Sequence, residues 1–192
     1  MRLSEYRQQA MRIANSMLAL KPIYIDTETT GFEATDVVVE IAVLETDGTL
    51  IYESLVKPKK SIPAQASAIH GITDVTVAWA PAWENVWPDV VDVVNGRVAG
   101  FYNAEFDMRM MRQSCGLNGI PWENPFVDDF CVMELFARYY GDWDPRRSKF
   151  RWQNLASAGQ FFHLPEPNSH RAKDDALLTK LILEKMAEGN LH

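Results

Sequence analysis

The chain has 192 residues and a formal net charge of −7, from 19 basic and 26 acidic side chains. Proteins that coat duplex nucleic acid carry broad basic faces, so this balance argues against that class while permitting an enzyme that holds a few phosphates. A hydrophobic content of 47% argues against disorder, and the length suits one domain. The apolar runs are too short to span a bilayer and no leader peptide is visible, so we expect no membrane partner. Two cysteines are too few for a disulfide framework, and we expect a reduced, cytoplasmic protein.

Residues 1–19 predict an amphipathic helix. Apolar side chains recur there at helical spacing, at Leu3, Tyr6, Ala10, Ile13, Ala14 and Met17. The pair Lys21–Pro22 ends this helix. Apolar segments then predict three strands, over residues 23–26, 37–45 and 49–56. Asp47–Gly48 supplies a tight hairpin turn between the last two strands.

The remainder of the chain alternates predicted helices and strands. A helix over residues 82–94 is interrupted or kinked at Pro88, because proline lacks the amide hydrogen that a helix interior needs. Further strands are predicted near residues 98–102 and 126–128, and further helices near residues 104–114, 130–139, 152–162 and 172–188. Hairpin strands followed by alternating helices and strands predict an α/β fold, with a mixed sheet flanked by helices.

Two carboxylates follow the first predicted strand. Asp26 and Glu28 are two residues apart, so on an extended chain they point to the same face. Carboxylates crowded in water-poor surroundings repel each other unless a cation or a proton lies between them. Oxygen ligands of this kind suit hard divalent cations such as Mg2+ or Mn2+. The pair therefore indicates a metal-dependent, nuclease-like site.

A histidine and two further acids lie at the start of the last predicted helix. His170 follows a proline-containing loop, and Asp175 falls in the first turns of the helix, so the histidine would reach over from the loop. Histidine suits a general base because the reference pKa of imidazole is about 6.5. Helical periodicity alone does not choose between Asp174 and Asp175 as the site acid.

Several short motifs stand in a fixed order along the chain. They are Asp26-Thr27-Glu28-Thr29-Thr30-Gly31, His70-Gly71-Ile72-Thr73, Asn103-Ala104-Glu105-Phe106-Asp107, and His170 with Asp175 five residues later. Together they resemble the DnaQ-like 3′→5′ exonucleases of the DEDDh group, which include proofreading epsilon-type polymerase subunits, exonuclease X and RNase T. The resemblance covers residues 22–185 and selects Asp175 over Asp174. Tyr102 is a departure, since many members have histidine at that position.

The resemblance implies an RNase H-like fold with His170 as the base that activates water. The carboxylates that would hold two Mg2+ or Mn2+ ions are Asp26, Glu28, Asp107 and Asp175. The residues that would contact the terminal nucleotide are Thr27, Thr29, Thr30, His70, Tyr102 and Asn103.

The reaction implied by the resemblance is hydrolysis of phosphodiester bonds from the 3′ end of single-stranded or frayed nucleic acid, releasing nucleoside 5′-monophosphates. DNA is the favoured substrate, although no residue decides the sugar. The alternatives are an exoribonuclease or oligoribonuclease-type activity, and a weakly catalytic accessory or proofreading module that acts through a polymerase. We expect residues 21–192 to form the exonuclease domain. Residues 1–20 would be a helical extension that packs on this domain or contacts a partner, such as a second copy of the chain.

Some features admit two interpretations. Trp79, Trp83 and Trp87 recur every four residues, which a core-facing helix explains better than an aromatic ladder that stacks bases. Residues 146–152 mix basic and aromatic side chains that would either hold a single strand or form a solvated loop. Glu40 lies in a predicted apolar strand, so it must be paired or face solvent.

Overall fold

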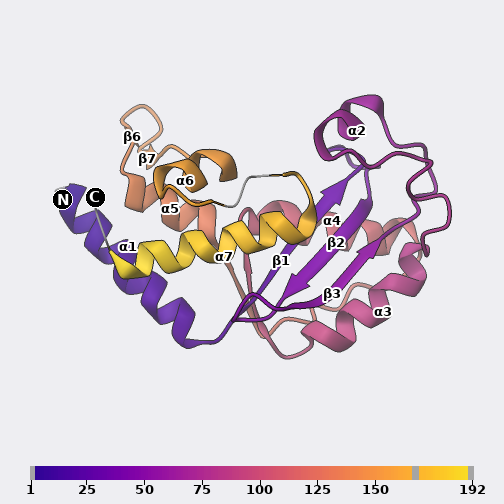
Figure 1. Cartoon of the computed structure of the whole chain (residues 1–192), viewed down its shortest axis with the longest axis horizontal. Helices are drawn as coiled ribbons and strands as arrows, with labels where there is room; N and C mark the ends of the chain where they lie inside the picture. The colour runs from indigo at the N-terminus through magenta and orange to yellow at the C-terminus, as the bar shows by residue number, and fades with distance from the viewer. Residues whose placement is uncertain (1–2, 166–168, 190–192) are drawn as a thin grey trace.

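The computed structural model describes residues 3–165 and 169–189. The helices are α1 (Leu3–Ala19), α2 (Ala64–His70), α3 (Trp83–Val94), α4 (Ala104–Leu117), α5 (Val132–Tyr140), α6 (Leu155–Phe161) and α7 (Ala172–Glu188). The strands are β1 (Ile23–Thr29), β2 (Val38–Leu44), β3 (Leu50–Leu55), β4 (Val98–Phe101), β5 (Asp128–Cys131), β6 (Trp143–Asp144) and β7 (Lys149–Phe150). Figure 1 shows a central sheet with helices on both sides, which confirms the predicted α/β fold.

The main sheet has five strands in the order β3-β2-β1-β4-β5. β1 is antiparallel to β2 and parallel to β4, so it lies where the strand direction changes. Its pairing with β4 covers only Ile23 with Ala99 and Tyr24 with Gly100. Among the described residues, no strand pairs with β1 on that side beyond Tyr24. Ligands of α/β proteins commonly bind outside the carboxyl ends of strands at such a switch point.

Side chains alternate along β1 between two helical layers. Ile23 and Ile25 pack in a core with side chains of α3 and α4, whereas Tyr24 packs in a second core with α1, α5, α6 and α7. Successive residues of a strand point to opposite faces, so Asp26 and Glu28 continue the Tyr24 face and point toward α7. The fold thus directs the acidic pair toward the helix that carries Asp175.

The N-terminal helix α1 packs on α5 and α7, as the apolar stripe predicts. Ala10 and Ala14 are buried at this contact, which lets the helices approach closely. The side chain of Arg7 adds a hydrogen bond, with Nε donating to the backbone oxygen of Tyr139 at 2.9 Å. None of the described helices is long and apolar enough to cross a membrane.

The structure differs from the sequence-based expectation at several element boundaries. α2 and the short β6–β7 hairpin were not predicted, β5 begins two residues later than the predicted strand, and α6 begins three residues later than the predicted helix. Pro88 does not interrupt α3, which is one helix from Trp83 to Val94. The ring is exposed, while Trp83, Trp87 and other apolar residues anchor the opposite face of the helix in the core.

The core-facing interpretation holds for two of the three tryptophans. Trp83 and Trp87 are buried and stacked with ring centroids 5.4 Å apart, which confirms the core-facing helix. Trp79 lies before that helix and is 98% exposed, so the core assignment is wrong for this residue. The four-residue spacing extends back to Trp79, before the helix begins, and outside a helix this spacing does not define one face.

Candidate active site

The acidic pair on β1 lies among other carboxylates. Burial raises the pKa of Glu28 to about 8, and the charge of Asp175 adds to the effect. Burial and the negative charges of Asp107 and Asp175 raise the pKa of Asp26 well above its usual range. Four acids from β1, α4 and α7 therefore share one electrostatic environment in the fold, as the motifs predict.

Asp107 reaches β1 from the first turn of α4. Its Oδ1 accepts hydrogen bonds from the backbone nitrogen of Thr27 at 3.1 Å and from Thr27 Oγ1 at 2.7 Å. Burial nevertheless raises the pKa of Asp107 to about 7, against the opposite effect of these hydrogen bonds. The contact occupies the open side of β1, where pairing with β4 has ended. Thr27 therefore positions Asp107 rather than presenting a free hydroxyl.

His170 and Asp175 lie on the two sides of the start of α7. His170 is exposed in the preceding loop with a φ of 53°, and Asp175 is buried in the first turn. Burial raises the pKa of Asp175 to about 7, although backbone hydrogen bonds from Ser169 and His170 lower it. The predicted arrangement, a histidine reaching over from the loop, is confirmed.

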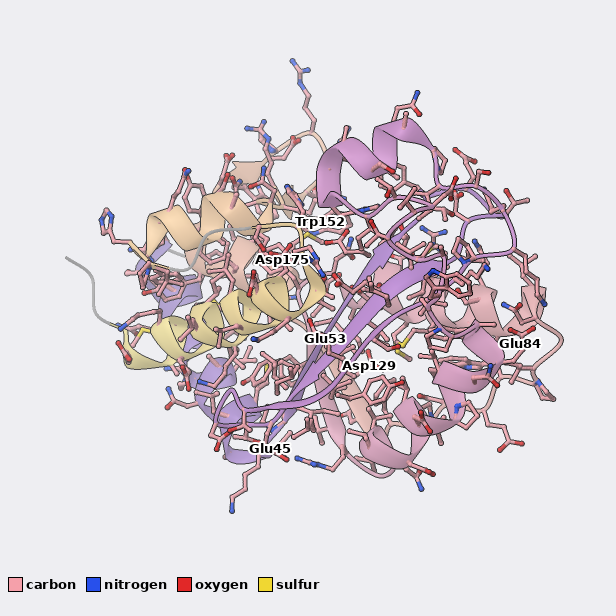
Figure 2. All side chains as sticks on the ribbon, turned by 45° about the vertical axis from the view of Figure 1, so that its right-hand side comes forward. Glu45, Glu53, Glu84, Asp129, Trp152 and Asp175 are labelled. Carbon is pink, nitrogen blue, oxygen red and sulfur yellow. The ribbon has the colours of Figure 1, made fainter. Side chains whose placement is uncertain are left out.

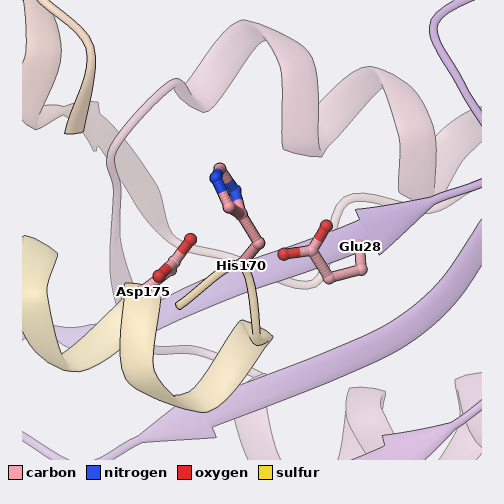
Figure 3. Close-up of side chains that lie close together, drawn as sticks. All are labelled: Glu28, His170 and Asp175. Carbon is pink, nitrogen blue, oxygen red and sulfur yellow. The ribbon is translucent and has the colours of Figure 1, made fainter. Parts of the chain in front are cut away.

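Glu28, His170 and Asp175 converge on one point. Each offers one potential ligand atom, and these atoms all lie within 4.8 Å of one another. Figure 3 shows the carboxylates of Glu28 and Asp175 coming from β1 and α7, with the His170 side chain rising between them. Two of the three are carboxylates, and carboxylate oxygens suit Mg2+ or Mn2+. Burial raises the pKa values of these acids, and a bound cation would favour their ionised forms, so the donor set fits a divalent cation.

The threonines after Glu28 stabilise the loop that leaves β1. Thr29 Oγ1 donates to the backbone oxygen of Gly31 at 2.8 Å, and Thr30 Oγ1 donates to Asp36 Oδ1 at 2.7 Å. Asp36 also accepts from the backbone nitrogen of Glu33 at 2.8 Å. These side chains hold the loop in place, which leaves its backbone groups as the candidates for contact with a substrate.

His70 is buried and ties α2 to this loop. The backbone nitrogen of Ile72 donates to Nδ1 at 3.0 Å, so that nitrogen carries no proton, and Nε2 lies 3.2 Å from the backbone oxygen of Thr29 as the donor. Burial lowers the pKa of His70, in keeping with a neutral ring. The described contacts give His70 a structural role at the wall of the site, and its predicted contact with the terminal nucleotide stays a prediction.

Tyr102 and Asn103 lie between β4 and α4. Tyr102 is buried, and its hydroxyl donates to the backbone oxygen of Gln153 at 2.8 Å. Asn103 is half-buried and precedes α4, where its backbone oxygen accepts from the backbone nitrogen of Asp107 at 3.2 Å. Tyr102 thus links β4 to the segment before α6, and the predicted substrate contacts of both residues stay predictions.

The structure adds two residues that the motifs do not identify. Glu40 on β2 is buried, and its carboxylate contacts the side chain of Arg171, which directly follows His170. An acid within an apolar strand signals that a partner is needed, but the partner is 131 residues away, so no local pattern points to it.

The basic and aromatic segment 146–152 forms part of the β6–β7 hairpin and the turn after it. Arg151 pairs with Asp142 at 3.3 Å and with Asp144 at 3.5 Å, so its charge is already balanced within the fold. Lys149 Nζ lies 4.6 Å from the centroid of the Trp152 ring. Trp152 also lines a groove of about 740 Å³ that extends from Asn103 along α4, α5 and β5. Both interpretations of the segment, a strand-binding element and a solvated loop, stay open.

Comparisons with known proteins agree with this geometry. The model of the RNase T exonuclease family matches residues 23–183. The uncharacterized exonuclease CP81 of Escherichia phage 186 is 37% identical over 175 residues, which cover 87% of this chain and 88% of that protein. The DNA polymerase III subunit epsilon of Treponema pallidum is 31% identical over 156 residues, covering 79% of this chain and 69% of that protein. The chain spans only 26% of a similar putative bifunctional exonuclease/endonuclease of Mycobacterium tuberculosis and 12% of a PolC-type DNA polymerase III of Thermotoga petrophila.

Solved structures show the same fold. Exonuclease X in complex with 5′ overhanging duplex DNA superposes with a TM-score of 0.64 at 29% identity, covering 86% of this chain and 90% of that one. The nuclease domain of 3′hExo, a DEDDh family member, superposes with a TM-score of 0.64 at 18% identity over the same shares of the two chains. The match to the family model, the arrangement of the acids and these superpositions lead to one conclusion. The chain belongs to the RNase T exonuclease family and is an exonuclease with an RNase H-like fold.

Proposed function

We propose that the chain hydrolyses phosphodiester bonds from the 3′ end of single-stranded or frayed nucleic acid, with DNA favoured, and releases nucleoside 5′-monophosphates. One observation carries the proposal: the potential ligand atoms of Glu28, His170 and Asp175 lie within 4.8 Å of one another in a member of an exonuclease family. The charges of Glu28, Asp107 and Asp175 also act on Asp26, two residues before Glu28 on β1. The preference for DNA draws support from exonuclease X, whose solved complex holds a duplex with a 5′ overhang and therefore a recessed 3′ end.

The four carboxylates would hold two Mg2+ or Mn2+ ions. Bound divalent cations stabilise the negative charge that develops on the scissile phosphate. Rigid elements position the ligands: β1 carries Asp26 and Glu28, the first turn of α4 carries Asp107, and the first turn of α7 carries Asp175. Such support matters because small displacements of a catalytic group cost large factors in rate.

His170 would accept a proton from the attacking water. Its ring lies at the solvent side of the site, close to Glu28 and Asp175 but in an exposed loop. A base in this place can take a proton from a water molecule beside the scissile phosphate and pass it to solvent. The backbone of Thr27, Thr29 and Thr30 and the His70 segment would border the terminal nucleotide on the other side.

The test is a direct assay of product and polarity. Single-stranded DNA and RNA of the same sequence, labelled at the 5′ end or the 3′ end, would be incubated with the purified protein and Mg2+, Mn2+ or EDTA. The proposal predicts metal-dependent release of mononucleotides, with a 3′ label released before a 5′ label and a faster rate on DNA than on RNA. A faster rate on RNA would assign the exoribonuclease alternative.

A folded protein without turnover on either substrate would support the accessory-module alternative. The similarity to a polymerase subunit epsilon then makes a polymerase the partner to test. Circular dichroism and a cooperative thermal transition would establish that the inactive protein is folded.

A further inference from the structure

Glu40 occupies a position where a charged side chain is costly. All residues of β2 are buried, and Glu40 is 1% exposed. An ionised carboxylate in such a place must be paired and hydrogen-bonded, because its desolvation costs more than the fold can otherwise compensate. Glu40 lies directly opposite Glu28 in the β1–β2 ladder, so both side chains lie on the face that points toward α7.

A single segment of the chain supplies the partners of Glu40. Arg171 Nε lies 3.1 Å from both carboxylate oxygens, and its Nη2 also contacts Oε1. The backbone nitrogen of Ala172, the first residue of α7, donates to Oε2 at 2.9 Å. Arg171 at the N-cap position makes no capping bond with its own side chain, so Glu40 caps α7 from a neighbouring strand.

This contact lies beside two residues of the candidate site, one before α7 and one in its first turn. His170 directly precedes Arg171, and Asp175 lies in the first turn of the helix. The nearby hydrogen bond from Ser169 Oγ to Asp174 Oδ2, at 2.7 Å, is internal to this segment and does not attach it to the sheet. The contact with Glu40 attaches this segment to β2, which pairs with β1, and β1 carries Glu28.

We propose that Glu40 is a positioning residue that acts through Arg171 and the start of α7 to set His170 and Asp175 against Glu28. This inference rests on the proposed function, in which these three residues form part of the catalytic site. Loss of the contact would let the start of α7 shift relative to β1. Displacements of about 1 Å in a catalytic group lower rates by about 100-fold.

The chain contains a matched control for a purely structural ion pair. Glu45, just after β2, accepts two hydrogen bonds from Arg97, at 2.6 Å and 3.2 Å, near the opposite end of the same strand. Both pairs join an arginine to a glutamate through two or more hydrogen bonds. The Arg97–Glu45 pair lies away from the site, and Glu45 is 33% exposed whereas Glu40 is 1% exposed, so it serves as a control for activity when such a pair is lost outside the site.

The experiment compares Glu40→Gln, Arg171→Met and the double variant with Glu45→Gln and Arg97→Met. For the first two variants we expect kcat to fall by about 10- to 100-fold with KM within about threefold of the wild type. The double variant should be no slower than the slower single variant, because both substitutions remove the same link. Glu45→Gln and Arg97→Met should lower Tm and leave kcat within about twofold.

A second readout needs no turnover: Mn2+ affinity, measured by calorimetry. Arg171→Met removes a positive charge beside the acids, so an effect of charge alone would tighten Mn2+ binding. Positioning predicts the reverse, a weaker affinity by about tenfold, since loss of outer contacts that orient ligands has effects of this size. Arg171→Lys, which keeps the charge and part of the contact, should restore part of the affinity.

The outcomes separate the two proposals. Tighter or unchanged Mn2+ binding in Arg171→Met, or wild-type kcat in Glu40→Gln with only a lowered Tm, would overturn the positioning role. A folded wild type that binds Mn2+ but does not degrade nucleic acid would overturn the proposed function instead. The Mn2+ affinities of the variants would then still decide whether Glu40 positions the ligands.

Discussion

The pKa values of carboxyl groups are shifted in opposite directions at the two ends of the central sheet. After β2, hydrogen bonds from Arg97 lower the pKa of Glu45 to about 2. At the carboxyl end of β1, burial raises the pKa values of Asp107 and Asp175 to about 7 and that of Glu28 to about 8. Figure 2 labels Glu45 near the hairpin end of the sheet and Asp175 at the start of α7. The acid that is paired with an arginine has a lowered pKa, whereas burial among other acids raises the pKa values in the candidate site.

The largest effect is expected from Asp26→Asn. This substitution removes one of the crowded carboxylates, so we expect kcat to fall by about 1,000-fold or more and the metal-free protein to unfold at a higher temperature. Turnover and Tm in EDTA measure the two effects. An Asp26→Asn protein with near-wild-type turnover would contradict the assignment of Asp26 as a ligand.

His170→Gln should lower kcat by about 100-fold, because a positioned base contributes factors of this order. Tm should hardly change, since the side chain is exposed. His163 is the matched control, because it is also exposed and has a φ of 52°, close to the 53° of His170. Equal losses of kcat in His163→Gln and His170→Gln would show that the effect does not come from the site.

The raised pKa values predict how stability depends on pH when no metal is present. The folded protein holds protons on Glu28, Asp107 and Asp175 up to about pH 7 to 8, whereas the unfolded chain releases them above about pH 4. The free energy of unfolding should therefore fall between about pH 5 and 8, with an upper limit of about 1.4 kcal/mol per pH unit for each acid that only the folded state keeps protonated. Urea unfolding in EDTA measures this fall, and Mg2+ should reduce it by favouring the ionised acids. A flat profile in EDTA would argue that the acids do not interact as described.

The smallest effect is expected at the opposite end of the sheet, from Glu45→Gln. The pKa of Glu45 is lowered, so its pair with Arg97 stabilises the fold above about pH 4.5 and loses this effect as pH falls toward 2. The side chain is 33% exposed, so we expect only about 1 kcal/mol at neutral pH. The difference in unfolding free energy between wild type and variant should vanish near pH 2. A difference that grows in acid would contradict the lowered pKa.

Local patterns were enough to predict much of the site. The alternation along β1 predicted that Asp26 and Glu28 share a face, and the loop before α7 predicted how His170 reaches Asp175. Pairing between distant segments was not predictable in the same way. Residues Asp128 and Asp129 are poor strand formers, yet they belong to β5 because β4 pairs with them in parallel register.

The same limit explains why Glu40 lacked a predicted partner. Its burial follows from an apolar strand, but Arg171 is brought to it by the packing of α7 on β1 and β2. Motif order predicted which residues form the candidate site, while the contacts that hold them depend on tertiary packing.

The early end of the β1–β4 pairing gives the site a built-in spectroscopic probe. The amide hydrogen of Thr27 would serve a neighbouring strand in a longer ladder, but here it is donated to Asp107 Oδ1. Its NMR chemical shift and hydrogen-exchange rate should therefore follow the protonation of Asp107 and the arrival of a cation. A single backbone resonance could thus report occupancy of the site without a substrate, a label or a reaction.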